Sequence, residues 1–276
     1  MKLSSFKRLN LAIGVVLVGW LLLIALVGLF YTPYDPSDVD LVTRYAAPSL
    51  QHWLGTDEFG RDVLSRIMAG AGVSVTVSVG SVLFALALGT TLGTVCGYVG
   101  GWLDRLALVL IDALMAFPGL LLALGIMTVL GPSKWAVVLA LGLAYTPSVM
   151  RLARGGTLSL RSRDFVVASR AMGNSGWWTL CRHVLPNCVA PLLIFSTSLF
   201  GSALLAESAL SFLGLGVPPP APTWGGMLAD SRGAIDRAIW LAIFPGMSIS
   251  LALLGINMLG DAVRDLLDPR MKGVVR

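Results

Sequence analysis

Few side chains in this 276-residue sequence could do chemistry, and they do not form a catalytic set. The two histidines, His52 and His183, lie far apart in the chain, and no GxSxG, HExxH or paired-carboxylate motif is present. The sequence also lacks a GxxxxGK[ST] phosphate-binding loop, so we do not expect it to hydrolyse ATP. We therefore expect no catalytic residue and no cofactor bound by this chain.

The three cysteines offer no metal site. Cys96, Cys181 and Cys188 contain no CxxC pair, and their number is odd. This spacing fits neither a zinc site nor a disulfide framework. We expect three free thiols and no metal ligand.

The composition places the chain in a membrane. Hydrophobic residues make up 56% of it and charged residues 13%, with a mean hydropathy of +0.81. Soluble domains carry about 25% charged residues. The net charge of +5 comes from short basic clusters between apolar runs, which suits lipid headgroups better than nucleic acid. The sequence predicts an all-α integral membrane protein that contacts lipid and binds no nucleic acid.

Apolar runs predict six transmembrane helices, because about 20 apolar residues are needed to cross a bilayer. The predicted spans are 11–30, 73–103, 113–133, 135–150, 184–206 and 238–260. The second span carries Gly89, Gly93 and Gly97, and small residues at every fourth position predict a close helix-packing face.

Basic residues predict the orientation. With the N-terminus inside, most of the 20 Lys and Arg residues fall in cytoplasmic segments, and both termini are then cytoplasmic. The predicted organisation is a cytoplasmic N-terminus and first helix (1–30), an outer loop (31–71) and a five-helix core (72–276). The core contains a long cytoplasmic loop, 151–186, which is too apolar to be disordered.

Ionisable residues within the spans are scarce and count as functional hypotheses. We expect Asp112 to pair with Arg105 or with a partner subunit. Glu207, near the outer end of the fifth span, could face a pathway through the membrane or pack internally. Phe117 and Pro118 interrupt the third span, where either a pore-lining kink or a packing kink is possible.

The cytoplasmic loop predicts a short amphipathic helix over 163–173. Phe165, Ala168 and Met172 recur at helical spacing, and Gly173 stands where a C-terminal glycine cap belongs. Such a helix could lie on lipid headgroups or dock against a partner. The residues alone leave both possibilities open.

The same loop resembles a known motif. The stretch VASRAMGNSGWWTLCRHVLPN (167–187) is similar to the cytoplasmic motif of ABC importer permeases: Glu-Ala-Ala, three residues, Gly, nine residues and an apolar-x-Leu-Pro ending. The positions that follow the motif are Ala168, Gly173, Leu185 and Pro186, with Ser169 a near match. Val167 departs from it where the family has Glu, and His183 departs where the family has Ile.

Four further segments narrow the resemblance to permeases for dipeptides, oligopeptides and nickel. They are GTDEFGRDVLSRIMAGA (55–71), GGWLDRLALVLIDALMAFPGLLLALGI (100–126), SFLGLGVPPPAPTWGGMLADSR (211–232) and GDAVRDLLDPR (260–270). In length and in its long first outer loop, the chain resembles the "C" member of a two-permease pair. The resemblance implies the type I ABC importer permease fold.

The resemblance also implies partners and a mechanism. The chain would form half of a translocation pathway for short peptides in a bacterial inner membrane, as a multi-pass protein that works by alternating access. Its partners would be a second homologous permease, one or two cytoplasmic ATP-binding subunits that bind ATP and Mg, and an extracytoplasmic substrate-binding protein. The alternatives are import of nickel or a metal–chelator complex and, less expected, gradient-driven secondary transport.

The resemblance assigns the cytoplasmic loop to coupling with the ATP-binding subunits. The residues expected to take part are Arg163, Asp164, Phe165, Val167, Ala168, Ser169, Met172, Gly173, Leu185 and Pro186. Outside the membrane, the charges of Asp57, Arg61, Asp62 and Arg66 have the i, i+4 spacing of a short surface helix. They could contact the substrate-binding protein or pair only with one another.

Overall fold

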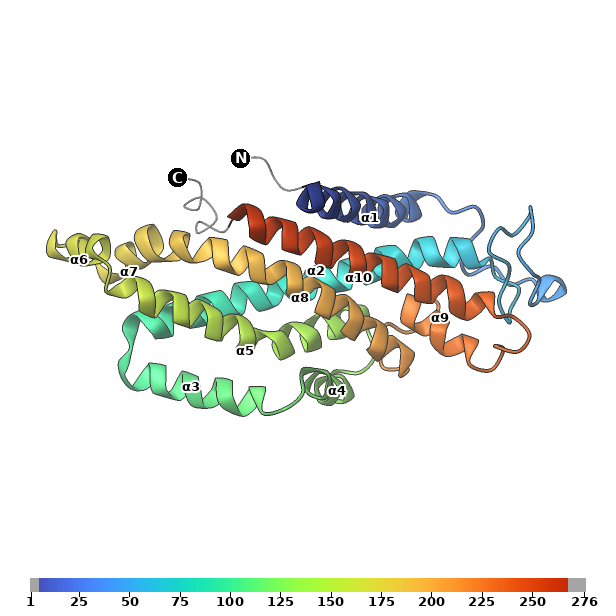
Figure 1. Ribbon diagram of the computed structural model, residues 1–276. Helices are drawn as coiled ribbons and strands as arrows, with labels where there is room; N and C mark the ends of the chain where they lie inside the picture. Colours follow the sequence, from blue (N-terminus) through green and yellow to red (C-terminus); the bar gives the residue numbers. More distant parts are fainter. Residues whose placement is uncertain (1–4, 268–276) are drawn as a thin grey trace.

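The computed structural model describes residues 5–267, and over this range the chain is helical without a β-strand (Figure 1). The elements in chain order are α1 (Ser5–Phe30), η1 (Leu41–Thr43), α2 (Val63–Val99), α3 (Gly101–Met115), α4 (Gly119–Leu130), α5 (Lys134–Arg161), α6 (Asp164–Ala171), α7 (Gly176–Thr179), η2 (Leu180–Val184), α8 (Leu185–Phe212), α9 (Trp224–Ser231) and α10 (Trp240–Leu267). η1 is a 3₁₀ turn and η2 a π-helical turn.

Five helical segments are long and apolar enough to cross a membrane: α1, α2, α5, the continuous run from α7 through α8, and α10. α3 and α4 together form a sixth candidate, but they are bent by 92°. The predicted break at Phe117 and Pro118 in the third span is confirmed, whereas the predicted bounds of that span, 113–133, are wrong: the two helices cover 101–115 and 119–130. Pro118 has no N–H and disfavours helical geometry at the residue before it, so the helix ends at Met115 and a new one begins at Gly119.

The predicted second span, 73–103, is wrong at both ends. α2 begins at Val63, because the Asp62 carboxylate accepts a hydrogen bond of 2.8 Å from the Ser65 N–H and caps the helix. It ends before Gly100, whose φ of +73° turns the chain into α3. The other predicted spans, 11–30, 135–150, 184–206 and 238–260, fall within α-helices with two exceptions. Residues 238 and 239 precede α10, and Val184 belongs to η2.

α2 and α5 pack along the predicted glycine face. A Cβ on Gly89 would lie 2.7 Å from the Val149 Cβ, and one on Gly93 would collide with the Met150 carbonyl oxygen. Gly97 faces the next turn of α5 in the same way. The small-residue face predicted from the sequence is confirmed, and it allows the two backbones to approach closely.

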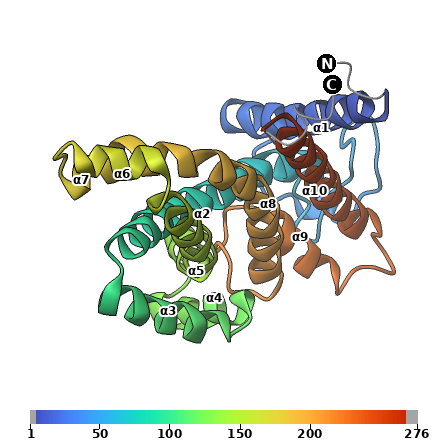
Figure 2. The same cartoon turned by 60° about the vertical axis from the view of Figure 1, so that its left-hand side comes forward.

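α1 and α3 lie at opposite edges of the bundle (Figure 2). α1 packs on α10 through a glycine on each helix: a Cβ on Gly14 would lie 2.8 Å from the Leu259 nitrogen, and one on Gly255 would lie 2.6 Å from the Leu17 Cβ. α3 is attached more loosely, with only Ala107 and Ile111 buried.

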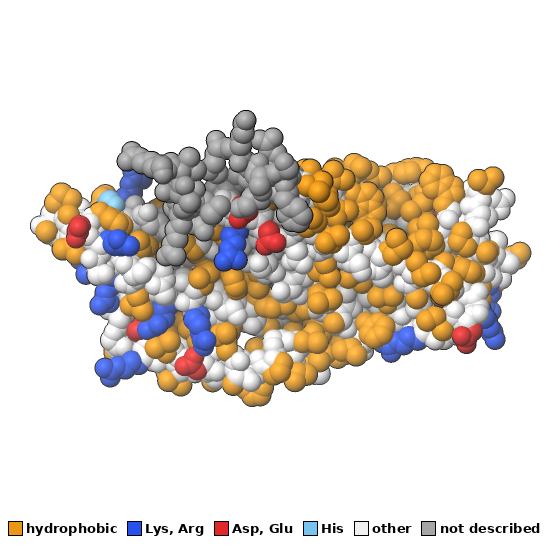
Figure 3. Space-filling model, viewed as in Figure 1, with side chains coloured by type: hydrophobic (Ala, Val, Ile, Leu, Met, Phe, Trp, Pro, Cys, Tyr) orange, Lys and Arg blue, Asp and Glu red, His pale blue; other side chains and the backbone are white. Residues whose placement is uncertain are grey.

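Hydrophobic and charged side chains occupy different parts of the surface. On the face in Figure 3, hydrophobic side chains cover the region of α1 and α10. Charged side chains gather mainly toward the end that carries α6 and α7, with a smaller group at the opposite end. An apolar middle between two charged ends is what a bilayer-spanning protein requires.

Replacing Gly89 by Leu should destabilise the fold. The new side chain would meet Val149 on α5, and overpacking of this kind costs about 1–3 kcal/mol. We expect a lower Tm for the purified chain in detergent. Gly155→Leu is the matched control, because a Cβ on Gly155 has no atom within 4 Å; an equal loss in both variants would contradict the close-packed seam.

Candidate functional site

Residues 163–186, which we predicted to be cytoplasmic and to couple to ATP-binding subunits, are called the coupling segment below. They contain the predicted short helix. α6 spans Asp164–Ala171, slightly shorter than the predicted 163–173. Asp164 lies in its first turn and Arg170 in its last, so both charges oppose the helix dipole favourably. Gly173 follows with a φ of +83°, and its N–H donates to the Arg170 carbonyl at 2.9 Å. The expected glycine cap is confirmed.

One face of α6 is fixed to the rest of the chain. Val166 and Ser169 are buried. The Ser169 and Thr179 hydroxyls lie 3.0 Å apart, and the Asn174 side-chain amide donates to Ser169 at 3.2 Å. Ser169, expected among the coupling residues, thus holds the segment together from inside.

The inner end of α2 supplies a second anchor for α6. The Arg170 Nε donates to the Tyr98 hydroxyl at 3.1 Å, and the Arg170 guanidinium stacks 4.6 Å from the centroid of the Tyr98 ring. Arg161 also reaches the Tyr98 carbonyl, at 3.3 Å. These contacts tether α6 to the inner end of α2.

The other face of α6 is unoccupied and apolar. Phe165, Val167 and Met172 are 43%, 54% and 75% exposed, and Ala168 and Gly173 are exposed beside them. Arg163 and Asp164 are exposed at the start of the helix. These five exposed apolar or small positions, three on α6 and two directly after it, form a surface suited to a protein partner.

The His183 ring packs against aromatic side chains next to this exposed face. Its ring lies 5.2 Å from the Trp178 ring and 6.4 Å from the Phe165 ring, both in edge-on orientation. Leu185 is half-buried and Pro186 exposed at the start of α8. The departure of His183 from the family motif thus falls in an aromatic cluster under the exposed face.

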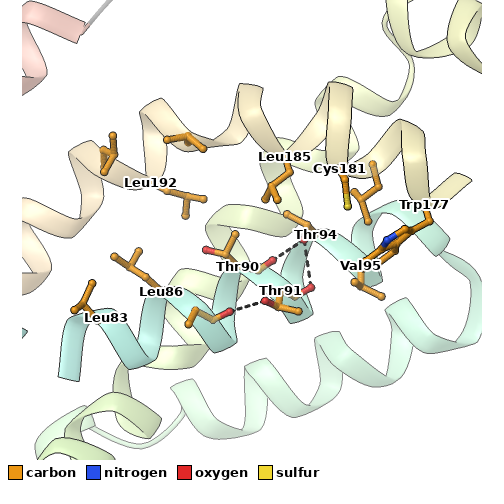
Figure 4. A pocket seen from close by; sticks show the side chains of 14 residues that line it. Leu83, Leu86, Thr90, Thr91, Thr94, Val95, Trp177, Cys181, Leu185 and Leu192 are labelled. Atoms are coloured by element: carbon orange, nitrogen blue, oxygen red, sulfur yellow. Dashed lines mark hydrogen bonds between the residues drawn. The ribbon is translucent and has the colours of Figure 1, made fainter. Parts of the chain in front are cut away.

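A groove of about 620 Å³ connects the coupling segment to the spans (Figure 4). Trp177, Cys181 and Leu185 line it from the coupling segment, opposite Leu86, Thr90 and Thr94 of α2. Thr94 donates to the Thr90 carbonyl at 2.7 Å, so its hydroxyl is satisfied by the backbone of α2. Most of the other side chains that line the groove are apolar.

The predicted surface helix at the outer end is wrong. Residues 55–62 form a tight loop, in which Gly55 and Gly60 have φ of +79° and +74°. The Asp57 carboxylate accepts hydrogen bonds from the N–H groups of Phe59 and Arg61 at 2.9 and 3.0 Å. An Asp side chain that binds nearby backbone in this way competes with helix formation.

The four charged residues of this region brace the loop from inside. Asp57, Asp62 and Arg66 are all less than 10% exposed. Arg61 and Arg66 place their Nε atoms 2.7 and 3.4 Å from the Asp57 carboxylate, and His52 lies 3.0 Å from Asp62. The exposed side chains of this loop include large apolar ones, notably Val42, Leu50 and Trp53, at 93%, 96% and 68% exposure.

A further member of this charge cluster was not predicted from the sequence. Asp230 of α9 lies 3.8 Å from Arg66 and ties α9 to α2. Burial raises the pKa of the Asp230 carboxyl above its usual range, and the nearby Arg66 opposes that shift. Only the fold brings these two residues, far apart in the chain, into contact.

Glu207 lies in the protein interior. Its side chain is fully buried and accepts hydrogen bonds of 2.9 Å from both the Ser74 and the Ser211 hydroxyls. Ser74 belongs to α2, so the carboxyl joins α8 to α2. Phe117 and Pro118, by contrast, are exposed at the bend between α3 and α4.

Asp112 does not pair with Arg105. Its carboxylate lies 2.5 Å from the Arg151 Nη2 on α5. Two turns earlier on α3, Asp104 receives two hydrogen bonds from Arg154, at 2.5 and 2.7 Å. Opposite charges on adjacent antiparallel helices, not on the same helix, therefore fasten α3. This second pair was missed from the sequence.

Thiol modification should distinguish the three cysteines. Cys181 is exposed and lines the groove, whereas Cys96 and Cys188 are buried. A maleimide should therefore modify Cys181 first, which intact-mass measurement would show as a single early adduct. Cys181→Ser should remove that adduct. Early modification of Cys188 would contradict the packing between α5 and α8.

Removing the Asp57 carboxylate should loosen the outer loop. Asp57→Ala removes the carboxylate that pairs with the buried Arg66 and the half-buried Arg61, and breaking a buried ion pair costs about 3–5 kcal/mol. We expect faster limited proteolysis within 41–62. Glu58→Gln is the control, because no residue within 5–267 forms an ion pair with that side chain; equal cleavage of both variants would argue against the brace.

Comparison with known proteins agrees with these features. Residues 89–273 match the family described as binding-protein-dependent transport system inner membrane component. A dipeptide transport system permease protein of Alkalihalophilus pseudofirmus is 43% identical over 98% of this chain and 89% of its own length. A putative peptide transport system permease protein of Brucella suis is 42% identical over 96% and 90%. A glutathione transport system permease protein of Pectobacterium atrosepticum is 40% identical over 97% and 89%. This chain is a bacterial inner-membrane permease of the binding-protein-dependent transport family.

Proposed function

We propose that this chain is one permease subunit of an ATP-driven importer of short peptides. The observation that carries the proposal is the family match together with relatives whose names specify dipeptide, peptide and glutathione transport. Each of these relatives aligns with 96% or more of the chain. Glutathione is itself a small peptide, so a short peptide is the substrate class that the three names share.

The proposed topology has six spans in the type I ABC importer fold, with α3 and α4 forming one broken span and both termini in the cytoplasm. The basic residues around the coupling segment support this orientation. Residues 1–30 would contribute the first span, 31–71 the outer loop, and 72–276 the core.

The partners follow from the family and from the exposed face of α6. A cytoplasmic ATP-binding subunit, which binds ATP and Mg, would receive Phe165, Val167, Ala168 and Met172. A second permease would complete the pathway, and an extracytoplasmic binding protein would deliver the substrate. Because Val167 replaces the usual glutamate, docking at this position would rest on apolar packing and not on a charge pair.

A movement of α6 would reach the transmembrane helices through elements that are directly connected to it. α6 is anchored to Tyr98 of α2 and to Thr179, and the helix runs without interruption from Gly176 to Phe212. A displacement of α6 by the ATP-binding subunit would therefore move the inner end of α8 against α2. The groove between them would open or close as the pathway alternates between its two sides.

A bulky residue at Ala168 should uncouple transport. Ala168→Trp adds a large side chain to an exposed helical position, so the chain should fold but no longer fit its partner. We expect uptake of a labelled dipeptide by cells to fall at least about tenfold, since 1.4 kcal/mol of lost docking energy already gives that factor.

The matched control is Ala168→Ser, which keeps the side chain small at the same position. It should retain uptake and co-purification of the ATP-binding subunit. Full uptake and co-purification in Ala168→Trp would refute the coupling role of α6. A position such as Gly173 is less informative, because its positive φ makes any side chain strained regardless of docking.

A further inference from the structure

A half-polar pocket lies at the end of the bundle that carries the coupling segment. α8 lies between α5 and α10 (Figure 2), and the three helices border a cavity of about 580 Å³. Asp261 and Arg264 of α10 line it together with Asn187 and Ser198 of α8, and the remaining wall is apolar. Cavities of about 300–1,000 Å³ that combine apolar walls with a few polar groups are typical of small-molecule sites.

The two charged side chains of this pocket have no partner in the described part of the chain. Asp261 and Arg264 are exposed, and neither side chain forms an ion pair or a hydrogen bond within residues 5–267. Their i, i+3 spacing would allow them to pair with each other, because the Cβ atoms of such residues are about 5–6 Å apart, but they do not. The pocket therefore offers a carboxylate and a guanidinium side by side, each able to bind a charge of the opposite sign.

Polar side chains continue from the pocket along the same two helices toward the outer end. Ser202 of α8 and Asn257 and Ser250 of α10 are exposed. Asn257 faces α8, because a Cβ on Gly201 would lie 3.6 Å from its Oδ1, and its amide has no hydrogen-bond partner within 5–267. The polar positions from Arg264 to Ser250 cover about 21 Å of α10 at 1.5 Å per residue. Polar side chains at such depth face a water-filled cavity or another protein surface and not lipid tails.

A short peptide carries the charges that this pocket can bind. Its ammonium and carboxylate ends are about 7 Å apart in an extended dipeptide, slightly more than the separation of Cβ atoms at i, i+3 positions. The ammonium can therefore reach Asp261 while the carboxylate reaches Arg264, each through charge-assisted hydrogen bonds. The Ser198 hydroxyl donates to no residue within 5–267 and remains available to the peptide bond.

A phosphatidylethanolamine headgroup carries the same two kinds of charge, but the polar positions beyond the pocket favour a peptide. A lipid would place its acyl chains along Ser202, Ser250 and Asn257, and the Asn257 amide would then be unsatisfied in an apolar environment. A water-filled path for a peptide keeps the same amide hydrated.

We propose that the pocket between α5, α8 and α10 is a transient binding site for the transported peptide, in which Asp261 binds the ammonium end and Arg264 the carboxylate end. This inference rests on the proposed function and names side chains that recognise the substrate during its passage. Binding should be weak, because a site on a transport path must release its solute again.

The first test measures access to the pocket in the assembled transporter, held in lipid nanodiscs without ATP or binding protein. Ser198→Cys places a thiol in the pocket, in a Cys181→Ser background that removes the exposed native thiol. A water-soluble cationic methanethiosulfonate should modify this thiol rapidly, as followed by the intact mass of the chain. The dipeptide alanylalanine, at about millimolar concentration, should slow the reaction.

Ser159→Cys is the matched control for this test. Ser159 is exposed on α5 toward the same end of the bundle, but it does not line the pocket. Its modification should not respond to alanylalanine.

The second test asks which end of the peptide each charge binds. N-acetyl-alanylalanine lacks the ammonium charge and alanylalanine amide lacks the carboxylate, and each should need at least about tenfold more peptide for half-protection of the thiol. Asp261→Asn should weaken protection by alanylalanine to the same extent, and acetylation of the peptide should then cause no further loss. Arg264→Gln should behave in the same way toward the amide. Each variant is compared with its own rate of modification without peptide.

Two further variants show whether the charge itself matters. Arg264→Lys keeps the positive charge and should keep most of the protection. Arg105→Gln removes an exposed arginine of α3 outside the pocket and should leave protection unchanged. The blocked peptides test the same idea on the pocket with both charges in place, so the result does not depend on how well a charge variant folds.

The outcomes separate this inference from the proposed function. A thiol at position 198 that does not react, or that alanylalanine does not protect, overturns the inference. So does protection that survives both Asp261→Asn and Arg264→Gln, or protection that follows the phosphatidylethanolamine content of the nanodisc and not the peptide. Import of alanylalanine by the wild-type transporter with its binding protein would leave the proposed function intact in all these cases. If the wild-type transporter imports no short peptide, the proposed function itself fails.

Discussion

The close contact between α2 and α5 is the constraint on which the other elements depend. Because Gly89, Gly93 and Gly97 let the two backbones approach, α2 forms a spine that reaches from the outer loop to the coupling segment. At its outer end, Asp62 and Arg66 hold the loop and α9. At its inner end, Tyr98 holds α6. α5 in turn carries the two arginines that fasten α3, so this edge of the core is also positioned from the α2–α5 contact.

Buried polar groups in the spans have hydrogen-bond or ion-pair partners, because an unpaired polar group in a membrane is costly. The Glu207 carboxyl is enclosed by two serine hydroxyls, and Asp104 is paired with Arg154 through two hydrogen bonds. Each of these groups also joins two helices that are distant in the sequence. The polar contacts within the spans thus contribute to tertiary arrangement, whereas the apolar residues around them mainly exclude lipid and water.

The sequence predicted those features that depend on local pattern. Apolar runs located the spans, glycine spacing located the α2–α5 face, and helical periodicity with Gly173 located α6, because each signal is contained within one segment. It did not predict contacts between segments: Asp112 and Arg151 are 39 residues apart, and Asp104 and Arg154 are 50 apart. Nor did it predict that Asp57 would bind its own backbone, because the i, i+4 charge pattern of a helix also fits a turn around a glycine of positive φ. Phe117 and Pro118 marked a break in the third span, but the size of the bend depends on how α4 packs across α5 and α8.

The π-helical turn at Leu180–Val184 has an evolutionary consequence. A π-turn accommodates one extra residue within a helix, and each α-helical residue advances the facing direction by about 100°. The turn therefore lets the orientation of the coupling segment be adjusted without rotating α8, whose side chains line the groove and bind α2. Substitutions that change the direction in which α6 faces can accumulate on one side of this turn, while the packing of α8 on α2 stays the same.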